Sequence, residues 1–304
     1  MLENVLNVLP DDISREISNI NSSGGITEIR LRVGKKGVIV LGGTELHLSR
    51  VIKLEDLLEI LVNISKNSIY AIQNEINNGF VVIRGGHRIG ICGEVVMQNS
   101  EIKNIKNISS MNIRIARQLL GCADKIMPYI INENRIKNTL IVSPPGCGKT
   151  TILRDAVRQI SNGVRALGFN GCNVGLVDER GEIASVSYGI SNLDVGNRTD
   201  ILSNISKSKG MEMLVRSMGI SVVATDEVGS QSDVEAIKYA SLSGVNMIFT
   251  MHGSSFYDVL RKKGIKELIE DGLFDKIIVL SNRKGPGTIE SIQSISDFKK
   301  EGVV

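Results

Sequence analysis

The sequence lacks most of the features that mark secreted, membrane-spanning and nucleic-acid-binding proteins. Its 304 residues include four cysteines, five prolines, no tryptophan and only 4% aromatic residues. No run of about 18 consecutive apolar residues occurs, so we expect no transmembrane helix. The first residues, MLENVLNVLPDDIS, have neither the basic region nor the apolar core of a signal peptide. We therefore expect a cytoplasmic protein that associates with a membrane only peripherally, through a partner.

The net charge and the cysteines argue against two further classes. A net charge of +3, with basic residues spread along the chain, is too small to indicate a polyanionic partner, so we expect no direct binding of nucleic acid. The cysteines form no CxxC pair, and Cys147 lies inside a glycine-rich loop that a disulfide would obstruct. His47 and His87 have no partner at ligand spacing, so no metal site built only from protein ligands is indicated.

The hydrophobic pattern, in contrast, is that of a chain with a substantial core. The spacing of apolar residues changes near residue 138. The elements expected before this point are paired strands at 28–43, a helix at 51–68 and a hairpin at 80–95. In the hairpin, Gly85 and Gly86 supply the positive φ angles that a two-residue turn requires. We therefore predict a small α+β domain over residues 1–137.

After residue 138, short apolar strands alternate with helices. The strands are expected at 139–143, 174–178, 220–226 and 245–251, and the helices at 151–161 and 233–244. Continuous apolar runs of this length are typical of a parallel sheet that is buried on both faces. We therefore predict an α/β domain over residues 138–304, with ligands bound beyond the carboxyl ends of the strands. The segment ISKSKGMEM, residues 205–213, is predicted to be a loop.

The segment 143–151, SPPGCGKTT, matches the phosphate-binding pattern G-x-x-x-x-G-K-[ST] except at its first position, where Ser143 replaces glycine. The segment joins a predicted strand to a predicted helix, so backbone N–H groups and the helix N-terminus would converge on an anion. We predict that ATP is bound by Ser143, Pro144, Pro145, Gly146, Cys147, Gly148, Lys149, Thr150 and Thr151. An accidental glycine-rich turn is the alternative, which the context disfavours.

Individual roles follow from the pattern. Gly146 and Gly148 allow a close backbone approach, Lys149 would reach the β- and γ-phosphates, and the Thr150 hydroxyl would bind Mg²⁺. Ser143 ends a strand, where a small residue suffices if φ stays negative. The sequence therefore predicts ATP and Mg²⁺ as cofactors.

Carboxylates follow a second apolar strand, which ends in Asp226 and Glu227. With this strand beside that of the phosphate loop, Asp226 would hold Mg²⁺ and Glu227 would polarise the attacking water, as nucleoside triphosphate hydrolysis requires. A pair of solvated acids is the alternative, which the preceding phosphate loop disfavours.

Two more predicted strands end in polar residues. The first is followed by Glu179 and Arg180, and Glu179 is either a second carboxylate that positions water or the partner of Arg180 in a surface ion pair. The other ends near His252, where a γ-phosphate sensor competes with a partly buried, hydrogen-bonded histidine. The residues by themselves leave both pairs of alternatives open.

An arginine that points at the γ-phosphate would stabilise the charge of the transition state, and in ring ATPases it often comes from a neighbouring subunit or domain. The candidates are Arg84, Arg88, Arg114, Arg117, Arg198 and Arg216. Sequence alone does not select among them, and each could be an ordinary surface charge.

The order of motifs outside the phosphate loop resembles the stage III sporulation protein AA family. These motifs are NGFVVIRGGHRIGICGEV, NISSMNIRIARQLLG, VDERGEIA, DVGNRTDIL, KGMEMLVRSMGISVVATDEVG and TMHG. The resemblance extends from about residue 26 to about residue 290. The family itself is similar to the secretion-superfamily ATPases of type II and type IV systems.

The resemblance implies a RecA-like P-loop NTPase core with a parallel sheet, preceded by the smaller domain, and a homo-oligomer in the form of a hexameric ring. The acidic box of the superfamily matches Asp178 and Glu179, the second strand motif matches Asp226 and Glu227, and the histidine box matches His252. Arginines of the N-terminal domain that reach the nucleotide across a cleft would be Arg84, Arg88, Arg114 and Arg117. The sequence departs from the pattern at Ser143 and in having Asp-Glu where many secretion ATPases have Gly-Glu.

The family is tied to endospore formation, which implies a cytoplasmic protein of the mother cell whose partners are membrane components of a channel to the forespore. We therefore predict a Mg²⁺-dependent ATPase, a motor that energises assembly of this channel or transport through it. Two alternatives stay open, namely a nucleotide-dependent scaffold with little turnover and a RecA-like ATPase stimulated by nucleic acid.

Overall fold

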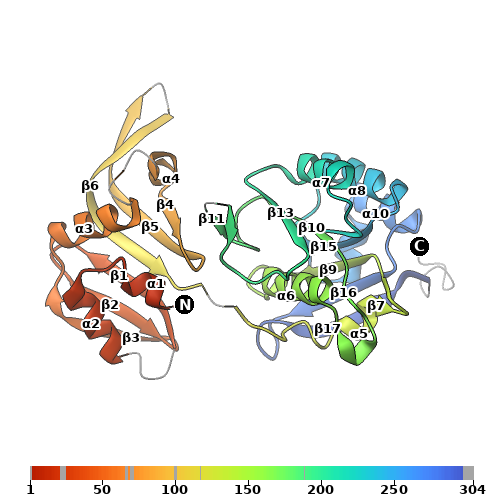
Figure 1. Ribbon diagram of the computed structural model, residues 1–304, viewed down its shortest axis with the longest axis horizontal. Coiled ribbons are helices and arrows are strands. Elements are labelled where there is room, and N and C mark those ends of the chain that lie inside the picture. Colours follow the sequence, from red (N-terminus) through yellow and green to blue (C-terminus); the bar gives the residue numbers. More distant parts are fainter. Residues whose placement is uncertain are drawn as a thin grey trace. The chain divides into compact units, whose positions relative to one another are not determined.

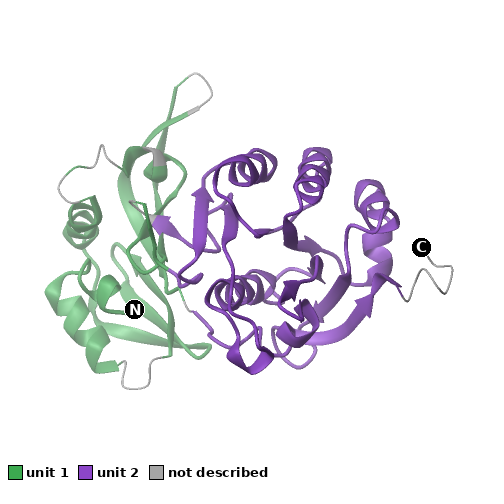
Figure 2. Ribbon diagram, turned by 45° about the vertical axis from the view of Figure 1, so that its right-hand side comes forward, with its two compact units in different colours: residues 1–117, 187–192 green, residues 118–186, 193–304 purple. Residues whose placement is uncertain are grey.

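The chain folds into two compact units, which are described here one at a time (Figure 2). The computed structural model describes residues 2–20, 25–65, 68, 72–98, 101–116, 118–187 and 189–296. Unit 1 comprises residues 1–117 and 187–192, and unit 2 comprises residues 118–186 and 193–304. Within the described ranges, no helix combines the length and the apolar character needed to cross a membrane.

The division after residue 117 lies earlier than the boundary expected at 137/138. The intervening segment contains α5 (Met127–Ile130) and a short hairpin of β7 (Ile131–Asn132) and β8 (Arg135–Ile136). Its apolar side chains are buried in a core cluster of unit 2, together with residues of the following strands and helices. Tertiary packing therefore assigns this segment to unit 2, although the change in hydrophobic pattern comes later in the chain.

Unit 1 is an α+β structure, as predicted, built on a six-stranded sheet of order β3-β2-β1-β6-β5-β4 (Figure 1). The strands are β1 (Ile26–Arg32), β2 (Lys36–Leu41), β3 (Thr44–Val51), β4 (Phe80–Ile83), β5 (His87–Gln98) and β6 (Glu101–Arg114), and the helices are α1 (Leu2–Leu6), α2 (Asp11–Ile20), α3 (Leu54–Ser65) and α4 (Gln73–Asn77). Each neighbouring pair of these strands is antiparallel. Alternate residues such as Ile29 and Leu31 enter one core with Ile13 of α2 and Leu57 of α3, because side chains alternate between the faces of a strand.

The predicted hairpin at 80–95 forms between β4 and β5, but its turn is longer than expected. Ile83 and His87 are the last paired residues, so Arg84, Gly85 and Gly86 make a three-residue turn. Gly85 and Gly86 have φ angles of 92° and 77°, which glycine adopts without the steric cost of a Cβ atom. The hairpin prediction is confirmed, and the two-residue turn is wrong because Arg84 is also part of the loop.

Unit 2 is an α/β structure around a seven-stranded sheet of order β13-β10-β14-β15-β9-β16-β17 (Figure 1). The strands are β9 (Thr139–Ser143), β10 (Val174–Asp178), β13 (Thr199–Ser203), β14 (Val222–Thr225), β15 (Asn246–His252), β16 (Lys276–Ser281) and β17 (Thr288–Ser294), and the helices are α6 (Lys149–Asn162), α7 (Lys207–Ser217), α8 (Gln231–Leu242), α9 (Phe256–Leu260) and α10 (Lys263–Glu270). All neighbouring pairs are parallel except β16 and β17. A short hairpin pairs β11 (Val186–Ser187) with β12 (Ile190–Ser191), and residues 187–192 belong to unit 1.

The apolar runs of unit 2 form the parallel sheet that the sequence predicts. In β9, Leu140 and Val142 enter one core cluster, whereas Ile141 enters a different cluster. Both faces of the strand are therefore buried, which explains why its sequence is continuously apolar rather than alternating.

Two details differ from the sequence-based predictions. β15 lies between β9 and β14, so the strand that precedes Asp226 does not lie directly beside the strand of the phosphate loop. The segment 205–213 is mostly helical, because α7 begins at Lys207 and buries Met211 and Leu214. Its polar composition concealed this buried face.

Candidate functional site

The segment 144–148 connects β9 to α6 and has the backbone geometry of an anion cradle. Gly146 and Gly148 have φ angles of 72° and 84°, and Gly148 is the N-cap of α6, with no side chain to cap the helix. No heavy atom lies within 4 Å of the position that a Cβ atom would take at Gly146. The first N–H groups of α6 and an uncrowded loop backbone therefore lie together, as phosphate binding requires.

Ser143 fits the end of the strand without the missing glycine. It is fully buried and pairs in register with His252 on β15. Its hydroxyl donates to the Pro144 carbonyl at 2.9 Å, and its own carbonyl accepts from the N–H of Gly253 at 3.2 Å. It is not among the described residues with a positive φ, so glycine is not required at this position.

Lys149 lies under the loop with only 6% of its surface exposed. Its ammonium group donates to the carbonyls of Ser143 at 3.3 Å and Pro144 at 3.4 Å. No ion pair joins Lys149 to a carboxylate in the described part of unit 2. A buried cation that is compensated only by neutral carbonyls favours an anion nearby.

Thr150 of α6 and Asp226, which follows β14, come together although β15 lies between β14 and β9. The Thr150 hydroxyl donates to Oδ2 of Asp226 at 2.5 Å. The Thr250 hydroxyl on β15 donates to the other carboxylate oxygen and accepts from the N–H of Glu227 at 2.9 Å. A hydroxyl and a carboxylate beside a phosphate loop are the oxygen donors that Mg²⁺ prefers, so these residues fit the expected ion.

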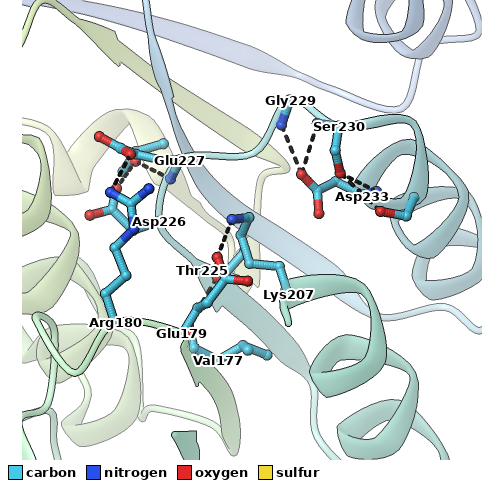
Figure 3. A network of polar contacts seen from close by, with 12 residues as sticks. Val177, Glu179, Arg180, Lys207, Thr225, Asp226, Glu227, Gly229, Ser230 and Asp233 are labelled. Atoms are coloured by element: carbon cyan, nitrogen blue, oxygen red, sulfur yellow. Dashed lines mark hydrogen bonds and ion pairs between the residues drawn. The ribbon is translucent and has the colours of Figure 1, made fainter. Parts of the chain in front are cut away.

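Glu227 follows Asp226 with an unusual backbone conformation, since its φ angle is 53°. Positive φ angles at residues other than glycine are costly and are concentrated at functional sites. One oxygen of its carboxylate lies 3.1 Å from Nη1 of Arg180 (Figure 3). Arg180 therefore pairs with Glu227 and not with Glu179, which removes the alternative ion pair considered for Glu179.

Glu179 instead pairs with Lys207, the first residue of α7. The Lys207 ammonium lies 2.5 Å from Oε2 of Glu179, and only 14% of the lysine side chain is exposed (Figure 3). No local pattern in the sequence indicated this lysine, because the contact joins the end of one strand to a helix much later in the chain.

Asp178 has a structural role, although it belongs to the same acidic box. It is 1% exposed and accepts hydrogen bonds from the backbone N–H groups of Glu182 (2.9 Å), Ile183 (3.1 Å), Ala184 (2.8 Å) and Ser185 (3.3 Å). Both of its oxygens are used in this way. Asp178 therefore fixes the loop that carries Glu179 and Arg180.

Arg154 on α6 also holds this loop, and the sequence did not identify it as a site residue. It is buried and donates to the carbonyls of Ile183 and Glu182, each at 2.5 Å. Burial lowers the pKa of Arg154, and the nearby Asp178 carboxylate opposes this effect. A charged residue between apolar helix positions was the only sequence signal for this role.

A polar cavity of about 430 Å³ opens at the carboxyl ends of β10, β14 and β15, next to these carboxylates. Its charged and titratable lining residues are Glu179, Lys207, Glu227, Asp233, His252 and Lys262. His252 is exposed, not partly buried as its structural alternative required. The cavity therefore brings three predicted site residues, Glu179, Glu227 and His252, into one place.

The arginines predicted in the N-terminal domain belong to unit 1. Arg84 is exposed in the turn between β4 and β5, and the Arg88 guanidinium lies 3.5 Å above the ring of Phe80. Arg114 is the cross-strand partner of Arg88. Arg117 lies outside the described residues. Contact of these arginines with a nucleotide stays a prediction.

The two arginines of unit 2 make structural contacts. Arg198 donates to the carbonyls of Ser161 at 3.0 Å and Asn170 at 2.9 Å. The Arg216 guanidinium lies 5.4 Å from the centre of the Tyr239 ring. Neither is part of the group formed by Thr150, Asp226 and Glu227.

Known proteins resemble this chain in sequence, over nearly its whole length, and in fold. The family model described as sporulation stage III, protein AA, matches residues 2–300. Stage III sporulation protein AA of Bacillus subtilis (strain 168) is 38% identical over 305 residues, which cover 100% of this chain and 97% of that protein.

Two solved structures share the fold at low identity. The ATPase DotB of Yersinia pseudotuberculosis has a TM-score of 0.62 and 13% identity, over 96% of this chain and 82% of that one. The pilus retraction motor PilT, with bound ADP, has a TM-score of 0.58 and 14% identity, over 88% and 76% of the two chains. The α/β fold predicted from the sequence is confirmed, and DotB and PilT share it. The chain belongs to the sporulation stage III protein AA family.

Proposed function

We propose that this chain is a Mg²⁺-dependent ATP hydrolase, a motor of the secretion-ATPase type that acts in endospore formation. The observation that carries the proposal is the contact between Thr150 and Asp226, which joins the phosphate loop to the end of β14 at 2.5 Å. The relatives support it, since a structural neighbour is described as a pilus retraction motor with bound ADP and a sequence relative as a stage III sporulation protein.

In this proposal, the loop from Ser143 to Thr151 holds the phosphates, through its backbone N–H groups and the buried Lys149 ammonium. Thr150 and Asp226 hold Mg²⁺, which neutralises negative charge on the phosphates. Asp226 is kept in place by the Thr250 hydroxyl on β15.

Glu227 is the base that orients the attacking water, and its backbone is fixed by the hydrogen bond from its N–H to Thr250. Its carboxylate must leave the ion pair with Arg180 before it can accept a hydrogen bond from water. Glu179, held by Lys207, and the exposed His252 line the same cavity and contact the reacting end of the nucleotide.

The functional form in this proposal is a hexameric ring in the mother-cell cytoplasm, associated with membrane components of a channel to the forespore. The arginines that would complete the nucleotide site are Arg84, Arg88, Arg114 and Arg117. Support comes from the register of β5 and β6, which places Arg88 directly opposite Arg114. Like charges in this position destabilise a sheet. Glu28 on β1 lies opposite Arg114 and supplies one negative charge, and a bound anion would supply a further one.

The test is ATP hydrolysis by the purified full-length chain with Mg²⁺, alone and with its membrane partners. The Lys149→Ala variant is the matched negative control, because it removes the buried ammonium. We expect the variant to lose at least about 100-fold in rate, as is typical when a group that stabilises transition-state charge is removed. Equal rates for the two proteins, in the presence of partners, would contradict the proposal.

A nucleotide-dependent scaffold with little turnover is the second candidate, and the ion pair between Arg180 and Glu227 favours it because the paired carboxylate is not free to accept a hydrogen bond from water. A Glu227→Gln variant separates the two functions. A motor with this change binds nucleotide but does not support sporulation, whereas a scaffold with it supports sporulation normally.

A further inference from the structure

The turn between β16 and β17, residues 282–287, lies against the phosphate loop. The N–H of Gly287 donates to the Cys147 carbonyl at 2.9 Å. A Cβ atom at Gly148 would lie 3.5 Å from the nitrogen of Gly287 and 3.6 Å from Cβ of Pro286. The turn therefore contacts the N-cap of α6, where the phosphates are proposed to bind.

The strand order places this turn on one side of the phosphate loop and the carboxylates on the other. β9 has β15 and then β14 on one side, and β16 on its opposite side. Because the Thr150 hydroxyl contacts Asp226 beyond β14, the metal and the terminal phosphate belong on that side. A triphosphate is a linear group, so the nucleoside leaves the loop on the side of β16.

The turn carries Arg283, whose guanidinium group makes one ion pair. Nη2 of Arg283 lies 3.1 Å from one oxygen of Glu290, and the Ser281 hydroxyl donates to the other oxygen at 2.5 Å. The same hydroxyl accepts from the backbone N–H of Arg283 at 3.1 Å. The arginine side chain is nevertheless 70% exposed, so one edge is held while the plane stays accessible.

The backbone of the turn is also held by internal hydrogen bonds. Gly285 has a φ angle of 105°, and its carbonyl accepts from the Thr288 hydroxyl at 2.7 Å. That hydroxyl in turn accepts from the N–H of Lys284 at 3.2 Å. A preorganised loop loses little conformational entropy when it binds a ligand.

We propose that the β16–β17 turn is the nucleoside-binding wall of the nucleotide site, with the Arg283 guanidinium stacked on the base. Arginine is suited to this contact because its planar, weakly hydrated guanidinium stacks on aromatic faces. Glu290 and Ser281 are positioning residues that hold the guanidinium edge. This inference rests on the proposed function, since it assigns a binding surface to the nucleoside of the same nucleotide.

The experiment compares two ligands, of which both carry a diphosphate group and only one carries a nucleoside. Binding of Mg-ADP and of magnesium pyrophosphate to the full chain is measured by calorimetry for the wild type, Arg283→Ala and Arg283→Lys. We expect both substitutions to weaken ADP binding by roughly tenfold, as loss of a base-stacking contact does. Pyrophosphate binding stays unchanged. The lysine variant keeps the charge but not the plane, so it distinguishes stacking from simple attraction.

Arg261→Ala is the matched control, because Arg261 is an exposed arginine of unit 2 that also pairs with an acid, Asp258, at 3.6 Å. It should bind ADP as the wild type does. If Arg283→Ala binds ADP as the wild type does, or weakens ADP and pyrophosphate binding equally, the proposed role of the β16–β17 turn is refuted. The proposal that the chain binds ATP is not affected by either result. If the wild type binds neither ligand, the proposed function fails and the wall fails with it.

Discussion

Replacement of Asp178 by asparagine tests whether this member of the acidic box is structural. The carboxylate is 1% exposed and accepts from four consecutive backbone N–H groups, at distances from 2.8 to 3.3 Å. Asparagine keeps the shape but has only one acceptor oxygen, so its NH₂ group would face N–H donors. The buried Arg154 also loses one of its nearby negative charges, while those of Asp226 and Glu182 stay.

The expected cost follows from these contacts. A hydrogen bond to a charged group contributes about 1.5–3 kcal/mol, and about half of the four bonds are lost. The loss of two such bonds predicts that Asp178→Asn lowers the free energy of unfolding of unit 2 by about 3–5 kcal/mol.

Glu179→Gln is the matched comparison, because Glu179 is the next residue and its side chain is 35% exposed. Loss of its ion pair with Lys207 should cost no more than about 1 kcal/mol. Urea unfolding followed by circular dichroism suits a chain without tryptophan. Hydrogen exchange adds local detail, and the amides of residues 182–185 should exchange faster only in Asp178→Asn. A loss below about 1 kcal/mol, or an equal loss in both variants, would refute the structural role.

Two further predictions concern titrating groups on and beside α6. Burial alone would raise the pKa of Asp155, but hydrogen bonds from Ala123 and Arg158 outweigh it and lower the pKa below its ordinary value of 3.8. Its contribution to stability is therefore present above about pH 4 and lost as the pH falls through the lowered pKa, so Asp155→Asn should destabilise the protein at neutral pH and the difference from the wild type should shrink as the pH falls below 3.8, as thermal unfolding would show. Burial, with the nearby Asp155 carboxylate, raises the pKa of the Cys122 thiol to about 11. Iodoacetamide at about pH 8 should therefore label the exposed Cys92 and spare Cys122 until urea unfolds the chain, and equal labelling rates by mass spectrometry would contradict this account.

The sequence was informative wherever an interaction is local in the chain. The glycine-rich loop at 144–148, its flanking strand and helix, and the buried parallel strands follow from patterns within about 20 residues. The hairpin at 80–95 follows from two adjacent glycines in the same way. Backbone conformation and strand burial depend mainly on neighbouring residues, and these features were predicted correctly.

Contacts between distant segments could not be predicted in this way. Nothing near Arg180 or Glu179 in the sequence indicates that the first pairs with Glu227 and the second with Lys207. The helix α7 was missed because its burial depends on a surface provided by other strands. Side-chain pairing of this kind is set by the sheet order, which a single sequence does not contain.

By itself, the sequence determined that this is an α/β protein with a glycine-rich loop between a strand and a helix, carboxylates at strand ends and a smaller α+β part before it. Only the tertiary structure decided which of the carboxylates at the strand ends line the cavity. Asp178 is used up by backbone N–H groups, whereas Glu179 and Glu227 face a cavity. The physical reason is that both kinds of carboxylate follow an apolar strand, and only the fold of the next few residues decides whether hydrogen-bond donors surround them.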